Sequence, residues 1–276
     1  ADADAATAAK AFFTAVDAEN KEIKVVEKAL ACLDKPVGPD PTLSIYEQAK
    51  AMNFTGTLPT YCPACGATEG VTWTALTNAS GQQLQGHYYL ADETVDLGAN
   101  HITVGTANGQ TLCVNLNGKT LTGGNGNGVF SMRTCVLNVM GDGNVTGGSS
   151  ANRVFNTNAG TINLYGGTYG VTSGRVVWSQ STGTVTLHEG TIDGTNSAFA
   201  VYLINGANFI MNGGAVTETR VYADDGSAMG NVTINGGTVD HLGVSMCNLT
   251  ITGGTFGQID VSADATVALS GKPVIG

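Results

Sequence analysis

The sequence has few charged residues, and basic residues are especially scarce. Asp, Glu, Lys and Arg make up 12% of the chain, whereas about 25% is usual in a soluble protein. Lys and Arg number 12 against 22 Asp and Glu, which gives a formal net charge of −10. Nucleic acids and anionic lipid surfaces are bound through clustered Lys and Arg, so we expect neither as a partner.

Long apolar runs are also missing. No stretch approaches the roughly 18 residues that a membrane-spanning helix needs, so we expect no membrane span. The chain opens with ADADAATAAK, which has neither the charged region nor the apolar region of a signal peptide. We expect a signal peptide to be absent or already removed. Low Lys content and an Ala-rich start are typical of a mature protein that is secreted or held at the cell surface.

Glycine is abundant where charge is scarce. The chain has 39 Gly residues, about twice the usual share of roughly 7%. Disordered chains lack apolar residues, but here 42% of the residues are hydrophobic. This composition predicts an all-β protein with many tight turns.

Residues 1–52 differ from the rest of the chain and predict a helical segment, which we expect to be a cap or an assembly element. Apolar residues recur there at helical spacing, namely Phe12, Val16, Ile23, Val26, Leu30 and Leu33. The spacing predicts an amphipathic helix of about 25 residues. A second helix is predicted near 41–52, with Asp40 as its N-cap and Pro41 as its first helical residue.

Residues 53–86 are predicted to be a linker, and residues 87–276 a repeat of short strands and turns. One inward apolar residue can be aligned in each unit, giving Leu116, Val139, Leu164, Leu187, Met211, Ile234, Ile251 and Leu269. Another apolar residue stands two positions before each of these, and Gly stands two positions after all but one. Each unit is too short to bury its apolar face alone, so the pattern predicts a solenoid of about nine stacked coils.

Two stretches carry a resemblance to a known group of folds. GHYYLADETVDLGANHITV and VFNTNAGTINLYGGTYG resemble the right-handed parallel β-helix repeats of large surface proteins from gut Firmicutes, which belong to the pectin-lyase-like superfamily. The resemblance covers roughly residues 87–276 and implies an all-β, right-handed parallel β-helix. It leaves the function open, because that superfamily includes lyases, hydrolases, adhesins and inert stalks.

One cysteine motif indicates a metal site. Cys62-Pro-Ala-Cys65-Gly resembles a zinc knuckle, in which two thiolates on a tight turn share one tetrahedral ion. A complete site needs two more ligands and the sequence has no second CxxC motif; His87, His101 and Cys113 are the nearest candidates. The alternatives are a Cys62–Cys65 disulfide or two free thiols.

Two further cysteines are predicted to be buried core thiols. Cys135 and Cys247 stand at positions with the same parity as the inward apolar residues, and a free thiol packs like a small apolar group. They lie several coils apart, so we expect no disulfide between them.

The third strand of each unit carries aromatic residues that predict a binding surface. If alternate residues point inward, an exposed row results, made of Phe130, Phe155, Trp178, Tyr202 and Tyr222. Arg153, Arg175 and Arg220 stand just upstream of the same strands. Aromatic faces and guanidinium donors suit stacking on sugar rings and hydrogen bonding to hydroxyls or uronates. The alternative is the reverse parity, with the aromatic rings stacked inside the coil.

Candidates for catalysis are few. Glu189, Asp193 and Glu218 fall on neighbouring coils near one turn, but no acid pair beside a basic residue is evident. We therefore expect an extracellular, non-enzymatic bacterial surface protein with a structural or adhesive role, acting through self-association, such as a head-to-tail filament, or through glycan binding. The alternatives are a polysaccharide lyase or glycoside hydrolase, and a spacer without a ligand.

Overall fold

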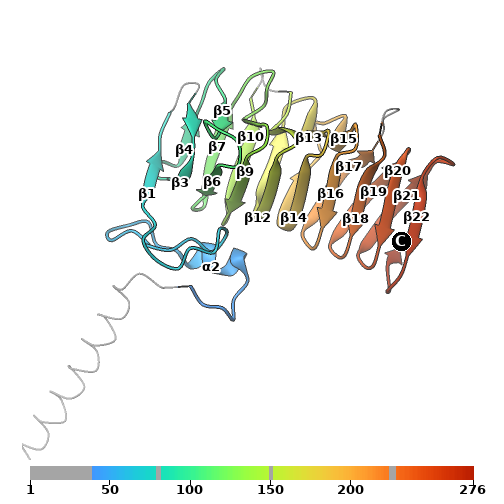
Figure 1. Ribbon diagram of the computed structural model, residues 1–276, viewed down its shortest axis with the longest axis horizontal. Helices are drawn as coiled ribbons and strands as arrows, with labels where there is room; N and C mark the ends of the chain where they lie inside the picture. Colours follow the sequence, from blue (N-terminus) through green and yellow to red (C-terminus); the bar gives the residue numbers. More distant parts are fainter. Residues whose placement is uncertain (1–38, 79–81, 149–151, 224–227) are drawn as a thin grey trace, which may run out of the picture.

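The computed structural model describes residues 39–78, 82–148, 152–223 and 228–276. In this part the chain is almost entirely parallel β-structure, wound into a solenoid of about 8 turns. The turns are stacked along the long axis of the molecule, from β1 at one end to β22 at the other (Figure 1). The expected right-handed parallel β-helix is confirmed, with slightly fewer turns than expected. The long helix predicted before residue 39 lies outside the described residues.

Each turn contributes up to three strands, and each strand pairs in parallel with the strands of the next turn. The first ladder consists of β1 (Trp73–Leu76), β3 (Gly86–Leu90), β6 (Thr111–Asn115), β9 (Val136–Met140), the start of β12 (Thr161–Val171), the start of β14 (Thr184–Asp193), β16 (Asn208–Met211), β18 (Gly230–Ile234), β20 (Cys247–Ile251) and β22 (Thr266–Leu269). Strand pairing thus begins at Trp73, inside the segment predicted to be a linker.

The second and third ladders are built in the same way. The second consists of β4 (Thr94–Asp96), β7 (Lys119–Gly123), β10 (Gly143–Gly147), the ends of β12 and β14, the starts of β17 (Ala215–Ala223), β19 (Thr238–Val244) and β21 (Thr255–Val261), and β23 (Val274–Ile275). The third consists of β2 (Gln83–Leu84), β5 (Ile102–Val104), β8 (Phe130–Met132), β11 (Phe155–Asn158), β13 (Arg175–Gln180), β15 (Phe199–Ile204) and the ends of β17, β19 and β21.

The inward residues of the first ladder form one continuous column. Leu164 pairs with Leu187, which pairs with Met211, and all three side chains are fully buried. Alternation along each strand sends these residues into the coil, where the next turn covers them. The sequence alignment is wrong at one rung, because Val114 and not Leu116 pairs with Val139. Both Val114 and Leu116 are nevertheless buried.

Asparagine side chains form a polar row on the outside of the first ladder. Asn231 Nδ2 donates to Asn208 Oδ1 at 2.6 Å, and Asn248 Nδ2 donates to Asn231 Oδ1 at 3.0 Å. Stacking in register places each amide next to the equivalent amide of the next turn, so donor and acceptor satisfy each other. This Asn row is a stabilising feature of the surface.

Helix α2 (Ile45–Ala51) lies against the flank of the solenoid beside β9 and β12 and not over its open end (Figure 1). The predicted N-cap is wrong: Ser44 caps the helix in a capping box with Glu47, and Asp40 precedes it in a turn. Asn115 Nδ2 donates to the carbonyl of Ala49 at 3.0 Å, which joins the helix to β6. No helix among the described residues has the length and apolar character that a membrane span requires.

A second, smaller hydrophobic core lies outside the coil, between the solenoid flank and residues 45–72. Its buried members are Ala49, Met52, Phe54, Tyr61, Cys62, Val71, Trp73, Cys113, Met140 and Tyr165. Trp73, Cys113, Met140 and Tyr165 belong to the first ladder, and the other side chains come from the segment that covers it. Residues 45–72 are therefore packed on the flank of the solenoid.

Candidate ligand-binding face and candidate metal centre

An outward column of aromatic residues runs along the third ladder. Trp178 of β13 pairs with Tyr202 of β15, which pairs with Tyr222 of β17. All three side chains are half-buried on the outer surface. We call this surface the arginine–aromatic face, which consists of Trp178, Phe199, Tyr202, Tyr222, Arg153, Arg175 and Arg220.

The three arginines of this face lie over the aromatic rings. Arg153 Cζ is 4.0 Å from the centroid of the Trp178 ring, and Arg175 Cζ is 4.8 Å from the same centroid. Arg220 Cζ is 4.7 Å from the centroid of the Tyr222 ring. A guanidinium is planar, so a stacked arginine keeps its N–H groups at its edges available to a ligand.

The rings of the face also contact one another. Phe199 stacks on Tyr222 with centroids 4.8 Å apart, and on Tyr202 at 5.2 Å. Trp178 meets Tyr202 edge to face at 5.7 Å. Phe199 was not predicted as a site residue from the sequence, although it is aligned with Arg175 on the neighbouring strand.

The face concentrates positive charge. No ion pair joins Arg153, Arg175 or Arg220 to a carboxylate among the described residues. Burial and the charge of Arg175 lower the pKa of Arg153, which means that the two guanidiniums repel each other. Trp178 Nε1 and Arg175 Nε are buried donors without a hydrogen-bond partner in this part of the structure. Such features cost folding free energy, so packing stability alone does not explain the face.

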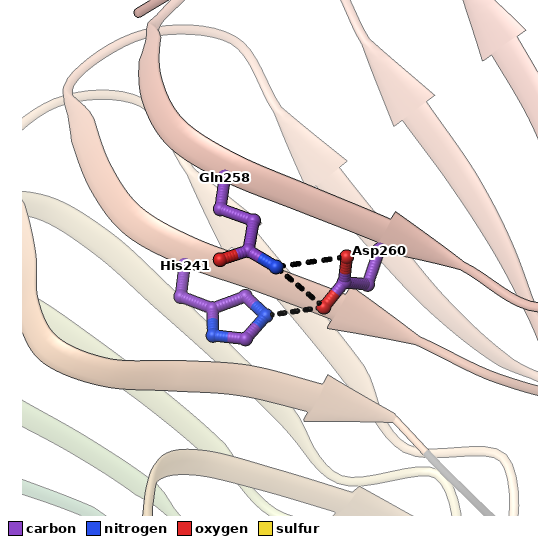
Figure 2. Close-up of polar contacts among 3 residues, drawn as sticks. All are labelled: His241, Gln258 and Asp260. Carbon is purple, nitrogen blue, oxygen red and sulfur yellow. Dashed lines mark hydrogen bonds and ion pairs between the residues drawn. The ribbon is translucent and has the colours of Figure 1, made fainter.

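An acidic residue borders the face where the rings end. Asp260 stands in the same column as Tyr222, with Gly243 between them. Its carboxylate accepts from His241 Nε2 at 2.8 Å and from Gln258 Nε2 at 3.0 Å (Figure 2). These hydrogen bonds, from Gln258 first and then His241, lower the pKa of Asp260. The carboxylate is thus engaged by neighbours on its own ladder, and the charge of Arg220 lowers its pKa less than they do.

Two of the predicted face residues point the other way. Phe130 and Phe155 are fully buried and stack on each other inside the coil, with centroids 5.8 Å apart. The predicted outward orientation is therefore wrong for both. Phe155 pairs with Val177, the inward neighbour of Trp178, because two consecutive residues turn inward at this corner of each coil, as in Val154–Phe155.

The three carboxylates considered for catalysis are used in local structure or remain apart. The Asp193 carboxylate accepts from the backbone N–H of Thr195 at 2.9 Å. Glu218 has a positive φ of 66°, and its N–H donates to the carboxylate of Asp240 at 2.8 Å. No hydrogen bond joins Glu189, Asp193 and Glu218 to one another in the described residues.

The cysteine motif lies in a second cluster, on the flank of the first turns. Cys62 N–H donates to the carbonyl of Ala67 at 2.8 Å, which closes the turn, and Gly66 has a positive φ of 75° within it. Hydrogen bonding from the backbone of Cys65 acts to lower the pKa of Cys62, and hydrogen bonding from the backbone of Ala67 acts to lower that of Cys65, against the larger causes that raise both. Such hydrogen bonds stabilise negative charge on sulfur, as a metal-bound thiolate requires.

Two ladder residues complete this cluster. His87 of β3 pairs in register with Cys113 of β6, so one side chain lies above the other. The ligand atoms of Cys62, Cys65, His87 and Cys113 all lie within 4.8 Å of one another, and His87 Nε2 is 3.3 Å from Cys65 Sγ. Two of the three additional ligands considered from the sequence are therefore present.

His101 does not belong to the cluster. Its Nδ1 is 2.9 Å from Asn125 Nδ2, and its Nε2 is 3.2 Å from Thr103 Oγ1. The expectation that His101 could be a ligand is therefore wrong, because it immediately precedes β5 of the third ladder, whereas His87 and Cys113 lie on the first.

The surroundings of Cys62 and Cys65 raise the pKa of both thiols and so favour their neutral form. The neighbouring thiol of Cys113, together with burial, raises the pKa of Cys62 well above its ordinary value. Burial also raises the pKa of Cys65. Asn138 is buried next to Cys113, and its Nδ2 donates to Cys113 Sγ at 3.4 Å. Cys135 and Cys247 are buried away from this cluster, as predicted for core thiols.

Comparison with known proteins adds no assignment to this geometry. No protein-family model, no curated protein and no solved structure matches the chain.

Proposed function

We propose that the protein is a non-enzymatic bacterial surface protein that binds acidic polysaccharide on the arginine–aromatic face. The single observation that carries this proposal is a surface on which three arginines lie over aromatic rings, with no ion pair to a carboxylate among the described residues, in a chain with net charge −10. An acidic chain would otherwise pair its few cations with its many carboxylates. Three clustered guanidiniums fit a ligand that brings its own negative charge.

The aromatic rings favour a sugar as the carrier of that charge. Half-buried Trp and Tyr rings offer flat apolar faces to the C–H face of a sugar ring and polar groups at their edges. The guanidiniums between them suit bidentate bonds to the carboxylates of a uronic acid. Neighbouring strands repeat every ~4.8 Å along the solenoid axis, a spacing close to one sugar unit in an extended chain. A uronan chain lying along the axis would therefore present about one unit to each turn.

The architecture suits an adhesive role at the outside of a cell. A stacked solenoid is a rigid rod that displays the same face on successive turns, which favours weak contacts repeated along a polymer. Membership of the pectin-lyase-like superfamily and a position at the bacterial cell surface are part of this proposal. Self-association in head-to-tail filaments would multiply the same contacts.

Replacing Trp178 with Ala tests the proposed face. The change removes the ring that carries both Arg153 and Arg175, and we expect about a tenfold loss of affinity for polygalacturonate. Affinity electrophoresis in gels containing this polymer measures the loss, and gels with a neutral β-glucan show whether charge is required. Tyr46→Ala is the matched control, because Tyr46 also lies under a cation, Lys50, but on α2.

The outcomes of this experiment distinguish binding of an acidic glycan from enzymatic cleavage and from binding that does not depend on charge. Equal retardation of wild type and Trp178→Ala in polygalacturonate would contradict the proposed face. Release of unsaturated or reducing ends from the polymer would assign the protein to the lyases or hydrolases. Retardation that is equal in neutral and acidic gels would contradict the role given to the arginines.

A further inference from the structure

We propose that Cys62, Cys65, His87 and Cys113 bind one zinc ion, which fastens residues 45–72 to the flank of the solenoid. Two ligands come from a tight turn in residues 62–67, and two come from adjacent rungs of the first ladder. The site is independent of the arginine–aromatic face, so either proposal can fail without the other.

The donor set selects the metal. Three thiolates and one imidazole form a closed tetrahedral site, which is the usual arrangement of structural zinc and leaves no position open for substrate. Tetrahedral bonds of ordinary length place neighbouring ligand atoms roughly 3.6–3.8 Å apart. The ligand atoms here lie within 4.8 Å of one another, with Cys65 Sγ and His87 Nε2 at 3.3 Å. Small side-chain movements are enough to reach bonding distance from a common centre.

The surroundings match what a zinc thiolate site needs. A zinc ion with three thiolates and a neutral imidazole carries a net charge of −1, which N–H donors around the sulfurs stabilise. The structure supplies them to three sulfurs: the backbone N–H of Cys65 and of Ala67, and the side-chain amide of Asn138. Cys62 and Cys113 are buried, so water does not compete for their positions.

The position of the site explains what the ion does. The turn carrying Cys62 and Cys65 belongs to the segment between α2 and β1, whereas His87 and Cys113 belong to the solenoid. A single ion thus joins these two parts at the second hydrophobic core, where Trp73 lies with its ring centroid 5.3 Å from that of His87. A structural ion at this junction stabilises the docked segment because the ligands come together only in the folded chain.

The proposal is tested by measuring the zinc content and the number of free thiols of the full chain. The protein is purified under reducing conditions and dialysed first against excess Zn²⁺ and then against metal-free buffer. We expect one zinc per chain by elemental analysis, and all 6 cysteines as thiols after denaturation with chelator. Cys113→Ser and His87→Ala should lower the bound zinc more than about tenfold. Asn138→Ala keeps all four ligands and should weaken zinc binding roughly tenfold. Cys247→Ala is the matched control and should keep the full zinc content.

A second measurement keeps the test decisive if a variant fails to fold. The chain has 2 tryptophans, and Trp178→Phe removes one of them, so that Trp73 is the one that remains. Adding Zn²⁺ to this variant, stripped of metal, should change the Trp73 fluorescence with a one-to-one endpoint. Co²⁺ should give the visible absorption of a tetrahedral thiolate complex. A folded wild-type chain that binds neither metal, or that has lost two thiols to a disulfide between site cysteines, would overturn the proposal.

Discussion

Phe155→Ala should lower the free energy of unfolding by about 3–5 kcal/mol, the usual cost of removing a buried Phe side chain. Phe155 is fully buried, stacks on Phe130 and meets the edge of Tyr169 at 5.1 Å. The truncation leaves a cavity that neighbouring turns cannot close, because their backbones are held by strand pairing on both sides. Equilibrium unfolding in urea, followed by circular dichroism, measures the change.

Phe199→Ala is the matched control for this substitution. Phe199 lies on the outer surface and is half-buried, so its loss removes ring contacts without opening the core and should cost about 1 kcal/mol. Equal losses for the two variants would contradict the inward orientation of Phe155. A smaller loss for Phe155→Ala would show that the third corner of the coil is built differently.

Gly143→Ala should lower the free energy of unfolding by about 2–5 kcal/mol. Gly143 has a φ of +136°, a backbone conformation that residues with a Cβ rarely adopt. A Cβ there would clash with the carbonyl oxygen of Lys119 and come within 2.7 Å of Leu116 Cβ. Backbone strain of about 1–2 kcal/mol therefore adds to overpacking of about 1–3 kcal/mol. Thermal and urea unfolding of the purified variant check the loss.

Gly126 provides the comparison within the same chain. It is exposed, and a Cβ built on it meets no atom within 4 Å. Gly126→Ala should change the free energy of unfolding by no more than about 0.5 kcal/mol. If both glycine variants unfold like the wild type, the start of β10 does not approach β7 as closely as these contacts require.

Much of the architecture follows from the period of the sequence. The column through Leu164, Leu187 and Met211 was predictable because each strand alternates and each coil has nearly the same length. Alternation fails at the third corner, where Val176 and Val177 are both buried before Trp178 turns outward. Simple alternation cannot be extended across such a corner, and this is why it predicts the wrong orientation for Phe155.

The two sites differ in how far the sequence defines them. Cys62 and Cys65 form a local motif and are visible directly, whereas His87 and Cys113 become neighbours only through the register of β3 and β6. His87 and Cys113 are separated in the sequence by about the length of one coil, which is the spacing expected of residues that stack on adjacent turns. His101 lies about half a coil from each of them, so the same criterion excludes it. Asn138, which donates to Cys113, and Phe199, which completes the ring stack, have no distinguishing pattern in the sequence. Their roles depend on packing.

Hydrogen exchange of the full chain with and without oligogalacturonate tests the central claim most directly, because it shows where an acidic glycan contacts the solenoid. The proposed face predicts slower exchange in Arg175–Gln180, Phe199–Ile204 and Ala215–Ala223, which carry its rings and two of its arginines. Peptides that cover the Asn row of β16, β18 and β20 should be unchanged. Protection confined to the Asn row, or none on the third ladder under saturating ligand, would contradict the account.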